Sequence, residues 1–321
     1  MVKVSVIIPA YNGDRFIGEA INGVLNQTYK DYEIIVVDDG STDNTAQIVN
    51  QYGDRIQYFS QANQGVAASR NFGFKAAVGE YIAFLDQDDV FLPHKLDSQV
   101  ALLEQNPSLG MVNSGWSIVN QQGEFQSEVQ PWLQIPDLSL ANLIIWKPVF
   151  LGAMLFRRNW LERSPGFNPA LEQTPDVDLV LRLAAMGCTA DWVEETTVKY
   201  RQHEENASNN TLLQARELNQ IVTSFFAQSD LSANIQALAT ESRYQTLIWS
   251  AWRLHQTGYL AQMQEYLYKS WSFDQEYPTK TILNWIESFR NYSGEYGKEF
   301  DVFSLTSSRE WQDLIRKTLL A

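Results

Sequence analysis

Short apolar runs alternate with helical repeats over the first ninety residues, and this alternation restricts the fold more than any other feature. The apolar runs have strand length, and between them apolar residues recur at the three- and four-residue spacing of a buried helix face. The expected strands are residues 2–8, 32–37, 56–59 and 81–85, with helices at 16–25, 42–52 and 66–77. Strands that alternate with helices predict an α/β domain whose mostly parallel sheet has helices on both faces.

Three of these strands are followed by a short segment that carries polar side chains. The segments are residues 9–12 (Pro9, Ala10, Tyr11, Asn12), 38–40 and 86–88. Ligands of open α/β sheets bind beyond the carboxyl ends of the strands, so the three segments are expected to converge on one rim.

The run Asp86, Gln87, Asp88 and Asp89 suggests a divalent cation. Alternation along an extended backbone would point Asp86 and Asp88 the same way, toward one Mg²⁺ or Mn²⁺ ion. Mg²⁺ usually takes one or two protein carboxylates and completes its shell with water and phosphate oxygens, which suits a nucleotide diphosphate. The alternative is a solvated acidic turn, because Asp favours turns.

Tyr11 and Asp39 are candidates for binding a nucleoside. The ring of Tyr11 could stack on a base, or it could be a half-buried residue of the rim. The carboxylate of Asp39 could accept a hydrogen bond from an imide nitrogen or a ribose hydroxyl, and Gly40 would let the turn approach a ligand closely. The alternative is that Asp38 or Ser41 caps the following helix.

Asn63, Gly65 and Arg70 lie at the start of the third helix, where free amides and a guanidinium suit phosphate or sugar hydroxyls. A surface salt bridge is the alternative for Arg70. Asp176 has the residue type and position of a general base at the rim, although a carboxylate in a first helical turn can also serve only the helix dipole. His203 is a lone histidine, which by itself is more typical of a structural role.

The pattern changes along the chain. Residues 111–119 and 149–157 are expected to be extended, 120–139 to form a long loop, 176–186 a helix, and 190–193 and 197–200 short strands. From about residue 211 only helical repeats remain, so we predict an α/β domain at 1–208 and a helical domain at 209–321. Five tryptophans of the second part are interpreted as core residues: Trp249, Trp252, Trp271, Trp285 and Trp311.

Composition excludes several classes of protein. The 321 residues carry a formal net charge of −14, which argues against nucleic acid as a partner. Cys188 is the single cysteine, so internal disulfides are excluded and a reducing compartment is favoured. A strand pattern begins at once without a secretory leader, and no run of about 18 apolar residues occurs. These features predict a cytoplasmic protein without a transmembrane segment, and docking at the inner face of the membrane stays open.

Five motifs in this order resemble the family 2 glycosyltransferases. The matching residues are 4–12 (VSVIIPAYN), 37–43 (VDDGSTD), 63–71 with Asn63, Gly65, Arg70 and Asn71, 79–89 (GEYIAFLDQDD), and Gly166 and Phe167 with Asp176 and Leu179. The resemblance covers residues 1–205. It implies a GT-A fold, a nucleotide-diphospho-sugar donor, a divalent cation and an inverting mechanism.

The resemblance also implies roles for single residues. Pro9, Tyr11 and Asp39 would hold the base and ribose, and Asp88 would lie nearest the metal. Asp176 falls on the catalytic base of the family. His203 falls on a Tyr-Arg-x-His tail that closes over the donor diphosphate, which makes it a second candidate metal ligand.

This chain departs from the family pattern at two positions. It has Pro175 before Asp176 where the family commonly has glutamate, and Pro165 before Gly166 where a second glycine is common. The first departure concerns the type of acceptor more than the catalytic base.

We therefore expect an inverting, metal-dependent glycosyltransferase that uses a nucleotide-diphospho-sugar, most simply a UDP-sugar. The acceptor would be a saccharide or lipid-linked saccharide, in polysaccharide or glycoconjugate synthesis. One alternative is a non-catalytic donor-binding or scaffold protein descended from a transferase. Another, a sugar nucleotidyltransferase, would need a glycine-rich basic loop after the first strand, and residues 9–13 do not form one.

Overall fold

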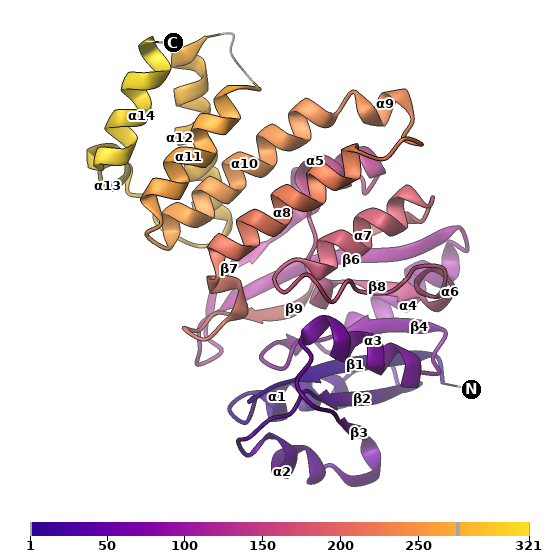
Figure 1. The fold of residues 1–321 in the computed structure, drawn as a ribbon. Helices are drawn as coiled ribbons and strands as arrows, with labels where there is room; N and C mark the ends of the chain where they lie inside the picture. Colours follow the sequence, from indigo (N-terminus) through magenta and orange to yellow (C-terminus); the bar gives the residue numbers. More distant parts are fainter. Residues whose placement is uncertain (1, 274–276, 321) are drawn as a thin grey trace. The chain divides into compact units, whose positions relative to one another are not determined.

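The computed structural model describes residues 2–273 and 277–320 (Figure 1). Its contacts divide the chain into two compact units. The first comprises the residues up to 139 together with 148–203, and the second comprises 140–147 together with the residues from 204 onward. The short segment 140–147 thus groups with the helical part although it lies within the α/β part of the sequence.

The first unit contains one sheet with the strand order β3-β2-β1-β4-β8-β6-β9-β5, and β7 pairs with β6 at its side. The strands are β1 (Val4–Ala10), β2 (Tyr32–Asp38), β3 (Gln57–Ser60), β4 (Tyr81–Phe84), β5 (Val90–Phe91), β6 (Leu109–Val119), β7 (Phe125–Val129), β8 (Leu155–Arg157) and β9 (Thr189–Arg201). Strands β1 to β4 are parallel to one another, as predicted, whereas the remainder of the sheet mixes both directions. The α/β prediction is confirmed, but "mostly parallel" describes only the first half.

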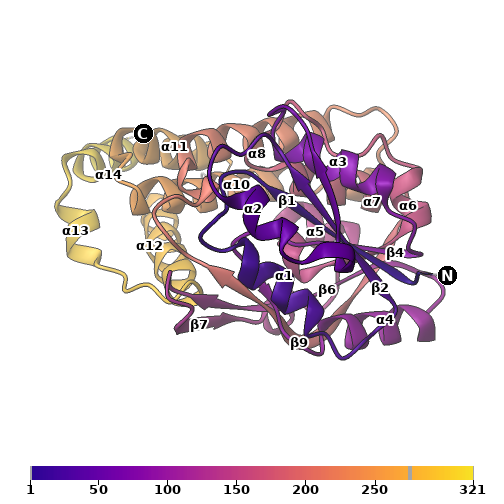
Figure 2. The same ribbon diagram turned by 90° about the horizontal axis from the view of Figure 1, so that it is seen from below.

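The strand order explains where the rim lies. The crossovers from β1 to β2 and from β2 to β3 run in one direction across the sheet, and the crossover from β3 to β4 runs back. Right-handed crossovers therefore place α1 (Ile17–Leu25) and α3 (Val66–Ala76) on opposite faces (Figure 2). The crevice at this reversal opens beyond the carboxyl ends of β1 and β4, where ligands of such sheets bind.

Helix α3 packs on the sheet at very short range. A Cβ atom added to Gly73 would lie 2.4 Å from the side chain of Ile7 on β1. All seven residues of β1 are buried, as expected of a strand covered on both faces. The same close packing holds the amino-terminal end of α3 at the rim.

Four features differ from the predictions. The expected loop at 120–139 contains β7, which forms an antiparallel pair with β6. The two short strands expected near the end of this unit are one strand, β9, whose register with β6 shifts between Ser114 and Trp116. Of the extended segment expected at 149–157 only β8 is a strand. Helix α5 (Leu140–Trp146) was not predicted. Strands β8 and β9 depend on pairing with distant segments, which local patterns do not reveal, whereas β7 is a short polar strand and α5 a short apolar helix.

Four further helices belong to the described part of the first unit. They are α2 (Thr45–Asn50), α4 (Lys95–Gln105), α6 (Arg158–Glu162) and α7 (Pro175–Ala185). Helix α7 ends at Ala185, and Gly187 just beyond it has a φ of +89°, in the left-handed region that favours glycine.

The second unit is helical. Besides α5 it contains α8 (Thr211–Phe226), α9 (Ala233–Gln236), α10 (Ala239–Gln256), α11 (Leu260–Trp271), α12 (Pro278–Glu295), α13 (Val302–Ser307) and α14 (Arg309–Leu320). The hydroxyl of Ser308 caps α14 by accepting from the backbone N–H of Trp311 at 3.2 Å. No helix in the described part of the chain is long and apolar enough to cross a membrane.

The tryptophans of the helical unit are core residues, as predicted. Trp252, Trp271, Trp285 and Trp311 are buried in one cluster, and Trp249 packs against it. The indole of Trp285 donates a 3.0 Å hydrogen bond to Ser270, and its ring meets Trp311 edge to face at 6.3 Å between centroids. Burial of a large ring with its polar atom satisfied makes this residue a main source of stability.

Replacing Trp285 with alanine should therefore destabilise the helical unit by about 3–5 kcal/mol, because the removed indole leaves a cavity and its hydrogen bond to Ser270 is lost. Chemical denaturation gives the free energy of unfolding, and amide hydrogen exchange localises the loss to the helical unit. The half-buried Trp249→Ala is the matched control and should cost less. Equal losses in the two variants would contradict the described core.

Candidate functional site

The loop after β1 is fixed by the side chain of Gln87. Its amide oxygen accepts from the backbone N–H of Tyr11 at 2.8 Å, and its amide nitrogen donates to the Tyr11 carbonyl at 3.0 Å. Gly13 makes room for this amide, since a Cβ there would lie 2.1 Å from its oxygen. The backbone of Tyr11 is thus held while its ring is 49% exposed at the rim.

Asp39 holds the loop before α3. Its buried carboxylate accepts from the backbone N–H groups of Gln64 at 3.0 Å and Gly65 at 2.7 Å, and from the side-chain amide of Gln61 at 2.7 Å. A carboxylate has about four acceptor positions, so these three donors leave room for roughly one more. Asp39 therefore has a structural function in addition to the ligand contact that the sequence suggested.

The neighbouring turn is shaped by Gly40, whose φ is +82° and whose added Cβ would lie 3.1 Å from the backbone nitrogen of Asn63. Asp38 accepts from the backbone N–H of Ser41 at 2.8 Å, which fixes the turn. Neither Asp38 nor Ser41 caps α2. The first N–H of this helix, that of Thr45, donates instead to the carboxylate of Asp43 at 2.9 Å.

Arg70 forms an ion pair with Asp86. Its guanidinium lies 2.6 Å from a carboxylate oxygen of Asp86, and the arginine is only 6% exposed. The guanidinium also lies over the ring of Phe167, 5.5 Å from its centroid. The Phe167 backbone is held in turn by the amide of Asn71, which donates to its carbonyl and accepts from its N–H, both at 2.8 Å. The salt bridge considered for Arg70 is present, and it lies within the rim.

Asp176 is electrostatically coupled to this pair. It lies in the first turn of α7, where one oxygen accepts from the backbone N–H of Val177 at 2.9 Å. Burial raises the pKa of Asp176 from its ordinary 3.8 to about 6; the charge of Asp86 also raises it, and that of Arg70 lowers it. Asp178, by contrast, forms an ordinary ion pair with Arg182 at 2.7 Å. The two carboxylates of this turn therefore have different environments.

Asp88 meets His203. Nε2 of the imidazole lies 3.0 Å from a carboxylate oxygen of Asp88, and the ring stacks on Phe16 at 4.9 Å between centroids. These residues come from the loop after β4 and the segment after β9, which are 115 positions apart in the chain. The structure thus brings the two candidate metal ligands together.

Sequence reasoning missed Arg201, which connects this region. The guanidinium donates to the carbonyls of Asp88 and Gln121, each at 2.9 Å, and pairs with Glu19 at 2.5 Å. Its backbone N–H donates to the buried carboxylate of Asp89 at 2.9 Å. Burial and the charges of the neighbouring aspartates hold the pKa of Asp89 well above its usual range. The available signal was the arginine of the Tyr-Arg-x-His pattern, two residues before the histidine.

Asp88 and His203 fit a hard divalent cation only as part of its coordination shell. No group of three or more His, Cys, Asp or Glu side chains within residues 2–273 and 277–320 is arranged to hold a metal ion. One carboxylate and one imidazole leave most of an octahedral shell to water and phosphate oxygens, which is how proteins usually bind Mg²⁺ together with a nucleotide. The donor set therefore fits a cation that arrives with a diphosphate.

The rim gathers the residues predicted from the three strand ends and from α3 and α7. Pro9 and Ala10 form the buried end of β1, and Asn12 is fixed beyond them by a 2.9 Å hydrogen bond from its N–H to Ser41. Asn63 and Gly65 lie on the loop before α3. An aromatic ring, a carboxylate–imidazole pair and a buried carboxylate thus lie at the switch point of the α/β sheet, where such folds bind their ligands.

Comparisons with known proteins identify the family. The family model described as Glycosyl transferase family 2 matches residues 5–163. An uncharacterised glycosyltransferase of Rickettsia typhi is 31% identical over 270 residues, which are 81% of this chain and 82% of that protein. A second, from a Nostoc species, is 33% identical over 77% of this chain and 84% of its own length. The chain belongs to glycosyl transferase family 2.

Longer relatives also match. An uncharacterised glycosyltransferase of Rickettsia conorii is 34% identical over 69% of this chain, and the match spans only 38% of that protein. Two solved structures share the fold at 19% identity and a TM-score of 0.63. S. aureus TarS 1-349 in complex with UDP-GlcNAc matches over 93% of each chain, and the mannosyltransferase PcManGT of Pyrobaculum calidifontis, in complex with GDP-Man and Mn²⁺, matches over 99% of this chain and 86% of its own.

The raised pKa predicts that Asp176 lowers the stability of the fold at neutral pH. The folded protein binds this proton more tightly than the unfolded chain, so stability falls as the pH rises from 3.8 to about 6 and stays lower above that. The difference corresponds to roughly 3 kcal/mol. Asp176→Asn should therefore raise the free energy of unfolding at neutral pH by up to that amount and leave it unchanged near pH 3.

Denaturant titrations at the two pH values measure this difference. Asp178→Asn is the matched control in the same helical turn and should be destabilising, because it removes the pair with Arg182. A carboxylate that only complements the helix dipole would behave like the control, with a loss of about 0.3–1 kcal/mol for Asp176→Asn at neutral pH. That result would contradict a raised pKa for Asp176.

Proposed function

We propose that this protein is an inverting glycosyltransferase that moves a sugar from a nucleotide-diphospho-sugar, in the first instance a UDP-sugar, to a hydroxyl of a saccharide or lipid-linked saccharide. The observation that carries the proposal is the position of Asp176, a carboxylate with a pKa of about 6 beside the Arg70–Asp86 pair. The loop that carries Asp86 also carries Asp88, whose carboxylate lies 3.0 Å from the imidazole of His203. We assign the reaction to polysaccharide or glycoconjugate synthesis on the cytoplasmic side of the membrane.

In this proposal Tyr11, Asp39 and the loop through Asn63 and Gly65 bind the nucleoside. The exposed Tyr11 ring offers a stacking face, and its fixed backbone reduces the ordering cost of binding. The remaining acceptor position of Asp39 suits an imide N–H or a ribose hydroxyl. The neighbours that bind UDP-GlcNAc and GDP-Man support a nucleotide-sugar as ligand, since they share this fold.

We assign the diphosphate and a Mg²⁺ or Mn²⁺ ion to Asp88 and His203. Bound there, the cation would neutralise charge on the leaving diphosphate. Asp86 is committed to Arg70, so Asp88 is the carboxylate of this loop that faces the cation. The Mn²⁺ complex of the archaeal mannosyltransferase supports a divalent cation in this fold.

Asp176 is assigned as the general base. With a pKa of about 6 it is ionised at neutral pH and yet more basic than an exposed aspartate, which suits removal of a proton from an acceptor hydroxyl. Its oxygen accepts that proton as the acceptor oxygen forms a bond to the anomeric carbon, while the bond from that carbon to the diphosphate oxygen breaks. Attack from the face opposite the leaving group inverts the configuration.

Binding of the donor should require both components. UDP with Mn²⁺ or Mg²⁺ should raise the melting temperature, whereas either alone should do little, because Asp88 and His203 supply too few ligands to hold a cation without the diphosphate. Asp88→Asn should abolish the metal-dependent part of the shift. Stabilisation by UDP that is equal in excess chelator would contradict the metal assignment, and GDP and dTDP serve as the alternative nucleotides.

Transfer should depend on Asp176 far more than donor binding does. Asp176→Asn should leave the affinity for UDP with metal nearly unchanged and lower the single-turnover transfer rate by roughly 10²–10⁴-fold, as expected for loss of a positioned base. The wild-type rate should be half-maximal near pH 6 and level above it, because the ionised carboxylate is the active form. Near-normal transfer by Asp176→Asn would remove this residue from catalysis. Donor binding without transfer by the wild-type protein would favour a donor-binding protein.

A further inference from the structure

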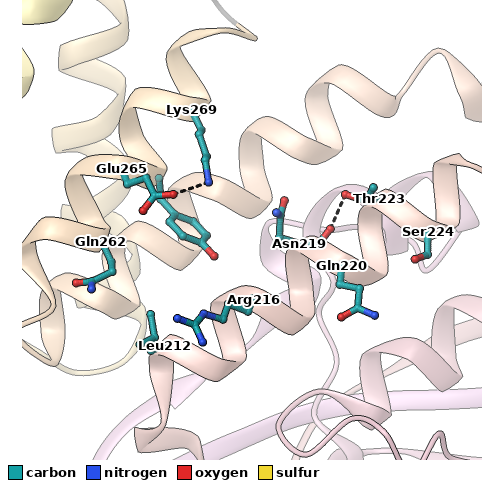
Figure 3. Close-up of a pocket in the computed structure, with 10 residues that line it drawn as sticks. Leu212, Arg216, Asn219, Gln220, Thr223, Ser224, Gln262, Glu265 and Lys269 are labelled. Atoms are coloured by element: carbon teal, nitrogen blue, oxygen red, sulfur yellow. Dashed lines mark hydrogen bonds and ion pairs between the residues drawn. The ribbon is translucent and has the colours of Figure 1, made fainter.

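The helical unit contains an open groove between α8 and α11, with a volume of about 420 Å³ (Figure 3). It is lined by Leu212, Arg216, Asn219, Gln220, Thr223, Ser224, Gln262, Glu265, Tyr266 and Lys269. All of these residues belong to the second unit, so the groove is distinct from the rim of the sheet. None of the residues that we assign to the nucleotide, the cation or the general base lines it.

The lining favours a ligand rich in hydroxyl groups. Its volume is typical of a small-molecule site, but such sites are usually apolar, and most of the side chains here are amides, hydroxyls or charged groups. Amides and hydroxyls both donate and accept, which matches sugar hydroxyls that do the same. Among them, the amide of Asn219 faces the groove from α8, and that of Gln262 lies across it on α11 (Figure 3). Tyr266 adds a largely buried ring, 6% exposed.

The charges of the groove favour an acidic ligand. Lys269 is paired with Glu265 at 2.6 Å, whereas the exposed guanidinium of Arg216 has no hydrogen bond or ion pair to any residue in the described ranges. The lining thus carries a net positive charge in a chain of net charge −14. A guanidinium presents a planar fork of donors that matches a carboxylate or a phosphate.

We propose that this groove binds an acidic saccharide, with Arg216 on a carboxylate or phosphate group and the amides of Asn219 and Gln262 on sugar hydroxyls. The choice of a saccharide rests on the proposed function, because a glycosyltransferase must hold an acceptor chain. The site would bind a segment of that chain away from the reacting hydroxyl and so select acceptors by charge. Binding of the saccharide in this groove would not require the nucleotide-sugar donor.

The test uses the full-length protein on an array of neutral, carboxylated and phosphorylated glycans, followed by titration calorimetry with the best-bound glycan. Arg216→Gln should weaken binding of acidic glycans about tenfold, the typical effect of losing a charged hydrogen-bond partner. Arg216→Lys should retain part of the affinity. The matched control is Arg290→Gln on α12, an arginine that is also exposed but lies outside the groove; it makes the same charge change and should bind normally.

Three results would overturn the proposal: no preference for acidic over neutral glycans, equal loss in the Arg216 and Arg290 variants, or competition by inorganic phosphate as strong as that by the glycan. The last would leave a simple anion site, and Asn219→Ala checks it independently, because that variant should weaken glycan binding alone. Binding of UDP with Mn²⁺ is measured in parallel on every variant. If the wild-type protein binds acidic glycans but not UDP with Mn²⁺, the proposed function is refuted and the groove remains a saccharide site.

Discussion

The arrangement of the rim depends on one buried arginine. The side chain of Arg201 connects three segments that are far apart in the sequence, through Glu19 on α1 and the carbonyls of Asp88 and Gln121. Burial of a guanidinium is costly unless its N–H groups are paired, and the ion pair and the two carbonyl contacts provide this pairing. Because one of these contacts is to the backbone of Asp88, the arginine fixes the loop that presents the Asp88 side chain to His203. The geometry of the candidate metal site is therefore a consequence of strand β9.

The carboxylates of the rim are compensated to different degrees by the groups around them. Asp86 is paired with Arg70, Asp88 lies against His203, and Asp89 is buried and accepts from the backbone of Arg201. Asp176 shares the electrostatic influence of Arg70 but has no ion pair of its own among the contacts of the described residues, and its pKa rises to about 6. Asp176 is therefore more basic than an exposed aspartate and is still ionised at neutral pH. This property suits the general base that we propose.

The sequence was most informative where function depends on local order along the chain. The four parallel strands, the polar residues after them and the start of α7 followed from periodicity, because each signal lies within one element. Strand β7, helix α5 and Arg201 did not. Strand β7 is short and polar, α5 is a short apolar segment, and Arg201 depends on partners many residues away. Asp39 is an intermediate case. Its position was evident from the sequence, but its bonds to Gln64 and Gly65 form only when the loop folds back on β2.

The two units place different demands on the sequence. Transfer of a sugar needs reacting groups held to within a fraction of an ångström, which explains why the rim is built from buried strand ends and paired charges. Recognition of a long acceptor needs less precision, because a second binding site on the same chain raises the local concentration of the acceptor without taking part in the reaction. The helical unit suits that function, since its core is complete in itself and the exposed residues of α8 and α11 can change without disturbing it. If the proposed groove binds the acceptor, a change at Arg216 would alter selection among acceptors and leave the residues proposed to bind the donor and move the proton unchanged.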